Sequence, residues 1–316
     1  MSTPADRGED GALAAFPPPD PLSGRLTVGF KTTPNGVTWP LLESLWVTAG
    51  ELDVFTVGWM ADHLTDARRA RGGNSWEAIT LMAALAHHVP GKWLGHAVLA
   101  NTFRLPAVVA KQAIALDHVT GGRCIVGLGA GWHEGEHEAY GIPLPPIGER
   151  IDRLESAAGV LRALFSAAAR TPPGVSSDDR FYPLHEAVSA PAPVTEAGPP
   201  IWLGGQKRRG IALAARTASG WLMPGVNAGD AGYLTEKRDA MLRALESIGR
   251  PGDGFTFAAQ VMCGSTAAER RVALASARAC VAAGAQHVIL GMTPSLGPEV
   301  LRAIAREVAE PLLERV

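Results

Sequence analysis

Residues 133–137 read His-Glu-Gly-Glu-His, which matches the HExxH pattern of zinc peptidases. In that pattern, two histidines one helical turn apart bind the metal and the glutamate activates water. Here a glycine inside the motif lowers helix stability by about 1 kcal/mol relative to alanine. Pro143 also occupies the position where the extended motif has its third histidine. We therefore expect a polar loop or a single helical turn at 133–137, and no metal site.

Directly before this motif, Gly127, Gly129 and Gly131 alternate at the end of an apolar run. A dinucleotide-binding fingerprint would have its third glycine at position 132, which is a tryptophan, and would continue into a long helix. Three alternating glycines still leave bare backbone, which a flat ligand or a phosphate can approach closely. Two interpretations stay open, a ligand-binding loop and tight packing alone.

A second stretch of bare backbone at 204–206 (Gly-Gly-Gln) follows another apolar run and precedes a helical pattern. Backbone N–H groups at a helix N-terminus bind phosphate. The next three residues, 207–209 (Lys-Arg-Arg), would be cations in a first helical turn, where they oppose the helix dipole. Either an anion binds at this helix start or the three side chains extend into water.

Asp62 and His63 are the third candidate pair, and they follow a strand predicted at 53–59. A histidine next to a carboxylate can act as a general acid or base near neutral pH. A purely structural Asp–His pair is the equally open alternative.

The elements that must position these residues alternate regularly along the chain. Strand-like apolar runs are predicted at 26–30, 53–59, 93–100, 124–129, 201–205, 220–223, 255–262 and 287–292, and helical patterns at 39–50, 76–88, 106–119, 149–165, 207–218, 230–248, 267–283 and 297–313. Several strands are continuously apolar, as strands buried on both faces are. Eight such units predict an α/β fold, a (β/α)8 TIM barrel whose active site lies at the C-terminal ends of the strands. A doubly wound sheet is the alternative, but no phosphate loop follows the first strand.

The composition limits the organisation and the partners of the chain. With 316 residues, 47% of them hydrophobic, we expect one barrel domain over 25–316, with an insertion around 166–199 that is rich in proline, serine and alanine. The acidic, proline-rich residues 1–24 are predicted to form a disordered tail. A net charge of −2 and the lack of an apolar segment of ~18 residues favour neither nucleic acid nor membrane as a partner. Three well-separated cysteines favour a cytoplasmic location.

These motifs occur together, and in the same order, in one known family. The chain resembles the luciferase-like monooxygenase superfamily, and more narrowly its branch of predicted coenzyme F420-dependent oxidoreductases. The motifs that carry the resemblance are ADHL (61–64), LGHAVLANTFRLPAVVAKQAIALDHVTGGR (94–123), GLGAGWHEGEHEAYGIPLPP (127–146), GERIDRLE (148–155) and PPIWLGGQKR (199–208). They span most of residues 26–225.

The resemblance implies a luciferase-like barrel with F420, or alternatively FMN, across the C-terminal ends of its strands. It implies that the carboxylate of Asp62 contacts the deazaflavin and that His63 lies near the reacting ring, so both are predicted catalytic residues. It also places a non-proline cis peptide and a bulge at Ala97-Val98, behind the ring. The residues predicted to contact the cofactor are Asp62, Ala97, Val98, Ala130, Gly131, Gly204, Gly205 and Gln206.

We therefore expect an oxidoreductase that transfers a hydride between F420 and a small organic substrate. An FMN-dependent monooxygenase that uses reduced flavin and O2 is the alternative, and a non-catalytic flavin-binding protein is a remote one. The cofactor's anionic tail is expected to meet either residues 207–209 or the arginines at 68, 69 and 71. Relatives that oxidise sugar phosphates carry Glu where this chain has Trp132 and Trp where it has Ala67, so such a substrate is not expected. Family members are often homodimers, and we expect the same here.

Overall fold

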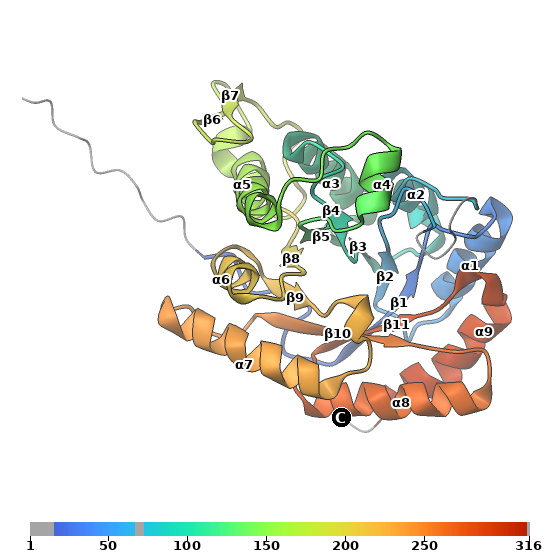
Figure 1. Ribbon diagram of the computed structural model, residues 1–316. Helices are drawn as coiled ribbons and strands as arrows, with labels where there is room; N and C mark the ends of the chain where they lie inside the picture. Colours follow the sequence, from blue (N-terminus) through green and yellow to red (C-terminus); the bar gives the residue numbers. More distant parts are fainter. Residues whose placement is uncertain (1–15, 67–72, 315–316) are drawn as a thin grey trace, which may run out of the picture.

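The structure, a computed structural model, describes residues 16–66 and 73–314 (Figure 1). Within these residues, eight parallel strands close into a barrel. They are β1 (Thr27–Thr32), β2 (Val57–Met60), β3 (Trp93–His96) with its continuation β4 (Leu99–Ala100), β5 (Cys124–Gly129), β8 (Ile201–Leu203), β9 (Gly220–Leu222), β10 (Thr256–Met262) and β11 (His287–Gly291). The ring closes because β3 pairs with β5 and β1 pairs with β11. The prediction of a (β/α)8 barrel is confirmed.

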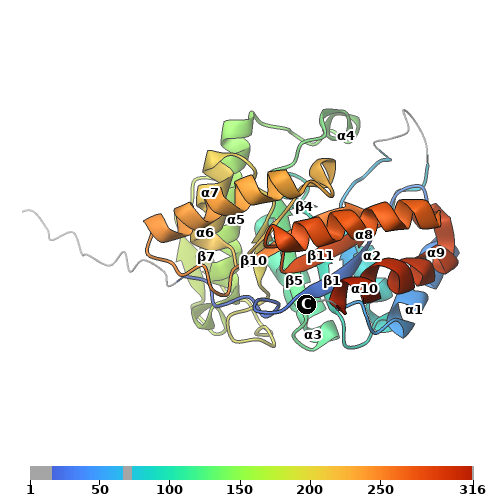
Figure 2. The same ribbon diagram turned by 90° about the horizontal axis from the view of Figure 1, so that it is seen from below.

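Helices surround this barrel (Figures 1 and 2). They are α1 (Trp39–Glu51), α2 (Ala78–Leu85), α3 (Pro106–Thr120), α5 (Ile147–Phe165), α6 (Arg208–Thr217), α7 (Ala231–Ser247), α8 (Ala267–Ala282), α9 (Gly297–Ile304) and α10 (Glu310–Leu313), with a short α4 (Glu134–Ala139) after β5. Local sequence sets their ends. Pro106 starts α3 and a left-handed Gly121 ends it, while Thr266 and Glu269 form a reciprocal capping box at the start of α8. Within the described residues, no helix is both long and apolar enough to cross a lipid bilayer.

Two tryptophans fill the middle of the barrel. Trp59 on β2 and Trp202 on β8 are fully buried, with their ring centroids 5.3 Å apart. Glycines on neighbouring strands make room for them. A Cβ atom at Gly29 would lie 2.7 Å from the Trp59 ring, one at Gly95 would lie 2.5 Å from it, and one at Gly220 would lie 2.7 Å from the Trp202 ring. The barrel interior is thus a packed core, and it has to bind its ligands at one end.

The segment before β1 closes the N-terminal end of the barrel. Leu22 is fully buried in the same interior cluster as Trp59 and Trp202. The carboxylate of Asp20 accepts hydrogen bonds from the Trp202 indole and, at 3.0 Å, from the Thr256 hydroxyl, and burial raises its pKa. The prediction of a disordered tail over 1–24 is therefore wrong for Asp20 and Leu22, because the open barrel end would otherwise expose its apolar interior to water. Residues 1–15 lie outside the described residues.

The insertion predicted at 166–199 contains an antiparallel hairpin of β6 (Val175–Ser177) and β7 (Leu184–Ala187), which lies beside α5 and outside the barrel (Figure 1). Its composition, rich in proline, serine and alanine, does not by itself predict these two strands. The last part of the insertion docks on α3, where buried Asp117 accepts a hydrogen bond of 2.8 Å from the backbone of Val194. The hairpin strands do not join the barrel.

Candidate active site

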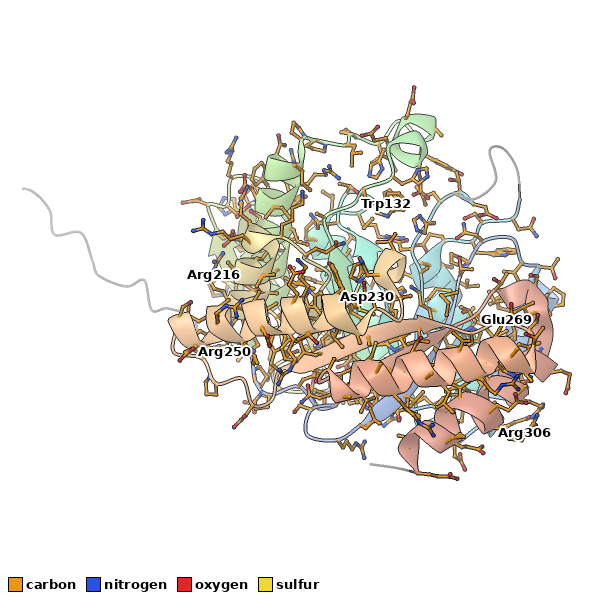
Figure 3. All side chains as sticks on the ribbon, turned by 60° about the horizontal axis from the view of Figure 1, so that its bottom comes forward. Trp132, Arg216, Asp230, Arg250, Glu269 and Arg306 are labelled. Atoms are coloured by element: carbon orange, nitrogen blue, oxygen red, sulfur yellow. The ribbon has the colours of Figure 1, made fainter. Side chains whose placement is uncertain are left out.

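A histidine–carboxylate pair lies at the C-terminal face of the barrel, the face at which the parallel strands end. His63 follows β2, and its Nδ1 lies 3.1 Å from Oε2 of Glu136 on α4. The Glu136 side chain is 1% exposed, whereas that of His63 is 25% exposed. Trp132, labelled in Figure 3 near α4, packs edge-on against His63 with ring centroids 5.9 Å apart. Among the described residues, Nε2 of His63 has no hydrogen-bond partner, so this nitrogen can exchange a proton with a ligand.

Glu136 also holds the backbone that carries His63. Its Oε1 accepts hydrogen bonds from the N–H groups of Leu64 and of Thr65, the latter at 2.9 Å. Burial alone would raise the pKa of Glu136, but the hydrogen bonds from His63, Thr65 and Leu64 outweigh burial and lower it. Because Glu136 stays ionised, Nδ1 of His63 carries the proton that lies between them, and Nε2 is left as the basic nitrogen.

Both histidines of the HExxH match form hydrogen bonds within the local structure. His133 is the N-cap of α4, and its Nδ1 accepts the N–H of Glu136 at 3.0 Å. His137 is buried; its Nδ1 donates to the His133 carbonyl at 2.8 Å and its Nε2 lies 2.7 Å from the Thr102 hydroxyl. In the described part of the chain, no group of three or more His, Cys, Asp and Glu side chains is placed to hold a metal ion. The motif lies on the six-residue helix α4 instead of a loop, and its second glutamate, Glu136, faces His63.

Asp62 is held in a buried ion pair. Its two carboxylate oxygens accept hydrogen bonds of 2.7 and 2.9 Å from Arg104, and Oδ2 also accepts the N–H of Ala100 at 2.9 Å. Arg104 extends to Glu77 as well. Burial would lower the pKa of Arg104, but the two carboxylates raise it. Asp62 thus ties the end of β2 to β4, and any contact with a cofactor would be added to these bonds.

The third strand is interrupted as the family resemblance implies. The bond between Ala97 and Val98 is cis, and it separates β3 from β4. The Val98 side chain lies between the ends of β5 and β8, 2.6 Å from where a Cβ atom of Gly129 would be and 3.7 Å from where one of Gly204 would be. The predicted bulge is confirmed, whereas its contact with a cofactor stays a prediction.

The alternating glycines at the end of β5 are explained by close packing against the third strand and the residues that follow it. A Cβ atom at Gly127 would collide with the His96 carbonyl oxygen, and one at Gly131 with the Thr102 hydroxyl. The space next to these glycines is therefore filled by the chain itself. The Gly131 carbonyl also accepts a hydrogen bond of 2.5 Å from Arg150, which holds the segment with partly buried Ala130 in place.

The Gly204–Gln206 segment joins β8 to α6. The Gly204 N–H donates to the Leu128 carbonyl at 3.1 Å. Gly205 packs so closely against Gly210 that a Cβ atom would lie 2.7 Å from the Gly210 backbone. Exposed Gln206 accepts a hydrogen bond of 3.0 Å from the Tyr233 hydroxyl. Residues 206–209, which lead into α6, are exposed.

The first turn of α6 suits an anion. Lys207 is its N-cap, no side chain caps it, and it holds no acidic residue. The Arg209 guanidinium forms an ion pair with Asp152 on α5. Lys207 and Arg208 form no ion pair with the described residues. The arginines at 68, 69 and 71, and Ala67, lie outside the described residues.

Residues 46–308 match the sequence model of the luciferase-like monooxygenase family. The chain belongs to this family. Its curated relatives include F420-dependent and FMNH(2)-dependent enzymes, and the family predicted from the motifs is confirmed.

Three curated relatives and one solved structure are informative. The chain is 30% identical over 240 residues to the F420-dependent glucose-6-phosphate dehydrogenase of Kribbella flavida, covering 71% of this chain and 70% of that enzyme. It is 31% identical over 149 residues to the phthiodiolone/phenolphthiodiolone dimycocerosates ketoreductase of Mycobacterium tuberculosis (strain ATCC 25618 / H37Rv), over 47% of this chain but only 37% of the ketoreductase. It is 29% identical over 171 residues to the FMNH(2)-dependent dimethylsulfone monooxygenase of Pseudomonas putida, covering 54% and 42%.

The solved structure is an F420-dependent secondary alcohol dehydrogenase in complex with an F420-acetone adduct. It superposes with a TM-score of 0.72 at 16% identity, covering 90% of this chain and 99% of that one. At this identity, the likeness concerns the fold alone.

Proposed function

We propose that this enzyme transfers a hydride between F420 and a carbonyl or alcohol group of a small organic substrate. The observation that carries the proposal is the His63–Glu136 pair, an imidazole fixed at one nitrogen and, among residues 16–66 and 73–314, without a partner at the other. When a hydride adds to a carbonyl carbon, the oxygen must take up a proton, and the reverse reaction releases that proton. His63 Nε2 would give or take it, as a general acid or base.

Several features of the C-terminal face fit the cofactor. The bulge at Ala97-Val98, with Val98 between the ends of β5 and β8, suits the back of a flat ring. The uncapped first turn of α6, with Lys207 and Arg208, suits an anionic tail. When bound, the deazaflavin supplies the carbon that donates or accepts the hydride.

The other site residues would position His63. Glu136 fixes the tautomer and the orientation of its ring, as a carboxylate partner does for a working imidazole. Asp62, whose oxygens bind Arg104 and Ala100, would hold the end of β2 against the bulge. We therefore assign Asp62 a positioning role and keep the catalytic role for His63. A homodimer and a cytoplasmic location stay predictions.

F420 is favoured over FMN because the relative that shares the largest part of its length with this chain, among the three described, is F420-dependent. The FMN alternative is supported by the dimethylsulfone monooxygenase, which is nearly as similar over a shorter stretch. The distinguishing experiment titrates the purified protein with F420, FMN and NADPH and follows cofactor fluorescence. We expect micromolar binding of F420 and no binding of FMN. Binding of FMN alone would overturn the proposal.

A further inference from the structure

Lys31 is a partly buried cation to which the proposed reaction assigns no role. It lies on β1, where Gly29 faces Trp59 in the barrel interior. Because side chains alternate along a strand, Lys31 points into the barrel as well. It is the next-to-last residue of β1, so its ammonium lies above the tryptophan core and toward the C-terminal face.

Gln260 on β10 is the partner of this ammonium. The Lys31 Nζ donates to its Oε1 at 2.7 Å, and the Gln260 Nε2 donates to the Met223 carbonyl at 2.6 Å. The second bond fixes the amide, so that its oxygen faces Lys31. The cluster is therefore a built arrangement of two side chains from two different strands.

The charge of Lys31 is not neutralised within the described residues. No acidic side chain there pairs with it, and one neutral amide oxygen serves an ammonium that has three donors. Burial lowers the pKa of Lys31 to about 8, so the cation still predominates at neutral pH. By contrast, Lys92 at the N-terminal end of the barrel donates to two carbonyls, those of Leu52 and Phe55, at 3.0 and 2.9 Å. An anionic oxygen next to Lys31 would offset its desolvation.

The cluster lies on a different part of the ring from the predicted cofactor contacts. Those contacts follow β2, β3, β5 and β8, whereas Lys31 and Gln260 lie on β1 and β10, with β11 between them. A ligand held by the cofactor residues would leave this part of the C-terminal face to the substrate.

We propose that Lys31 and Gln260 form an inner subsite that binds an anionic oxygen of the substrate, so that the substrates of this enzyme carry a carboxylate or a similar group. This inference rests on the proposed function, in which the cofactor occupies the part of the face that follows β2, β3, β5 and β8. A charge-assisted hydrogen bond to such a group is worth about tenfold or more in affinity.

The test uses butyrate and its neutral counterpart butyramide as probes, with binding measured by ligand-detected NMR on the free and the F420-saturated protein. The variants are Lys31→Met, Lys31→Gln and the matched control Lys111→Met, which removes one cation from the outer surface of α3. Thermal unfolding checks that each variant is folded, and the F420 Kd is measured for each.

We expect butyrate to bind the wild type and Lys111→Met, and to bind both Lys31 variants at least about tenfold more weakly, while butyramide binds all of them equally weakly. The F420 Kd should stay unchanged. Equal butyrate binding by the Lys31 variants, or none by the wild type, would contradict the subsite. Loss of F420 affinity in the Lys31 variants would reassign the ammonium to the cofactor and overturn the inference. If the wild type binds butyrate but not F420, the subsite stands and the proposed function fails.

Discussion

Two histidines at different levels of the same barrel show how different surroundings lead to different roles. His287 on β11 is fully buried, with Nδ1 2.7 Å from the Thr27 hydroxyl and Nε2 accepting from the Trp59 indole at 2.9 Å. Burial lowers its pKa to about 3, so the ring is neutral and both nitrogens are occupied. His63, at the C-terminal face, is partly exposed and uses one nitrogen only, on the ionised Glu136.

The same contrast holds for the two ends of the barrel. At the N-terminal end, the oxygens of Asp20 meet several donors, and Leu22 excludes water from the interior. At the C-terminal face, Lys31 and His63 keep donor or acceptor groups without partners in the described chain. Polar groups that are fully satisfied stabilise the fold, whereas unsatisfied ones next to solvent are available to a ligand.

Replacing His63 should have the largest effect, because His63 and not His287 takes part in the proposed reaction. His63→Asn removes the proton donor and acceptor, so we expect the rate of deazaflavin turnover to fall by about 10²–10⁴-fold while the F420 Kd stays unchanged. The measurement is a single-turnover absorbance trace with the substrate that the wild type converts fastest from a panel of alcohols, aldehydes and ketones. His287→Asn is the matched control and should lower stability, with little effect on the rate of the folded enzyme. Similar rate losses in both variants would remove the distinction.

A second variant tests how much the ion pair between Arg104 and Asp62 stabilises the C-terminal face. Arg104→Met leaves the carboxylate of Asp62 buried without its ion pair, which should cost about 3–5 kcal/mol in the free energy of unfolding. Denaturant titration measures the loss. The double variant with Asp62→Asn should recover part of it, because the unpaired charge is gone. A loss below about 1 kcal/mol would show that the pair contributes as little as a surface salt bridge.

The N-terminal closure predicts a loss of stability without a loss of function. Leu22→Ala should lower the free energy of unfolding by about 2–5 kcal/mol, because it opens a cavity in the barrel interior. The F420 Kd should not change. Leu105→Ala, at a residue 65% exposed, is the control and should have little effect. If Leu22→Ala unfolds like the control, the segment before β1 does not close the barrel.

The smallest effect is the pH dependence that His287 gives to the free energy of unfolding. Unfolded chains protonate His287 below about pH 6.5, but the folded protein does not until about pH 3. Its stabilising contribution is therefore complete above about pH 6.5 and declines as the pH falls toward 3. Between about pH 6.5 and 5.5 the loss should be about 1 kcal/mol, measured by denaturant titration. The slope should flatten in His287→Asn and persist in His63→Asn; an unchanged slope in His287→Asn would assign it to other groups.

Much of the barrel follows from local sequence. The strand 124–129 and the helix that begins at Pro106 were predicted with their observed starts, because apolar periodicity and caps act over short distances. The bulge at Ala97-Val98 came from the family motif and not from physical reasoning. The pairing of His63 with Glu136 could not be predicted, since it joins residues 73 apart in sequence; the signal available was an acid on the loop after β5, which reaches the same face. The Leu22 closure was missed because its proline-rich surroundings resemble disorder.

Hydride transfer from F420 is tested most directly by asking whether reduced F420 alone supports the reaction. The enzyme is loaded with reduced F420 under anaerobic conditions and mixed with a panel of aldehydes and ketones, including oxo acids, while the absorbance of the oxidised deazaflavin is followed. We expect this absorbance to return without O2, with one alcohol formed for each cofactor oxidised. No return of absorbance without O2, together with substrate oxygenation when FMN, a reductant and O2 are supplied, would contradict it.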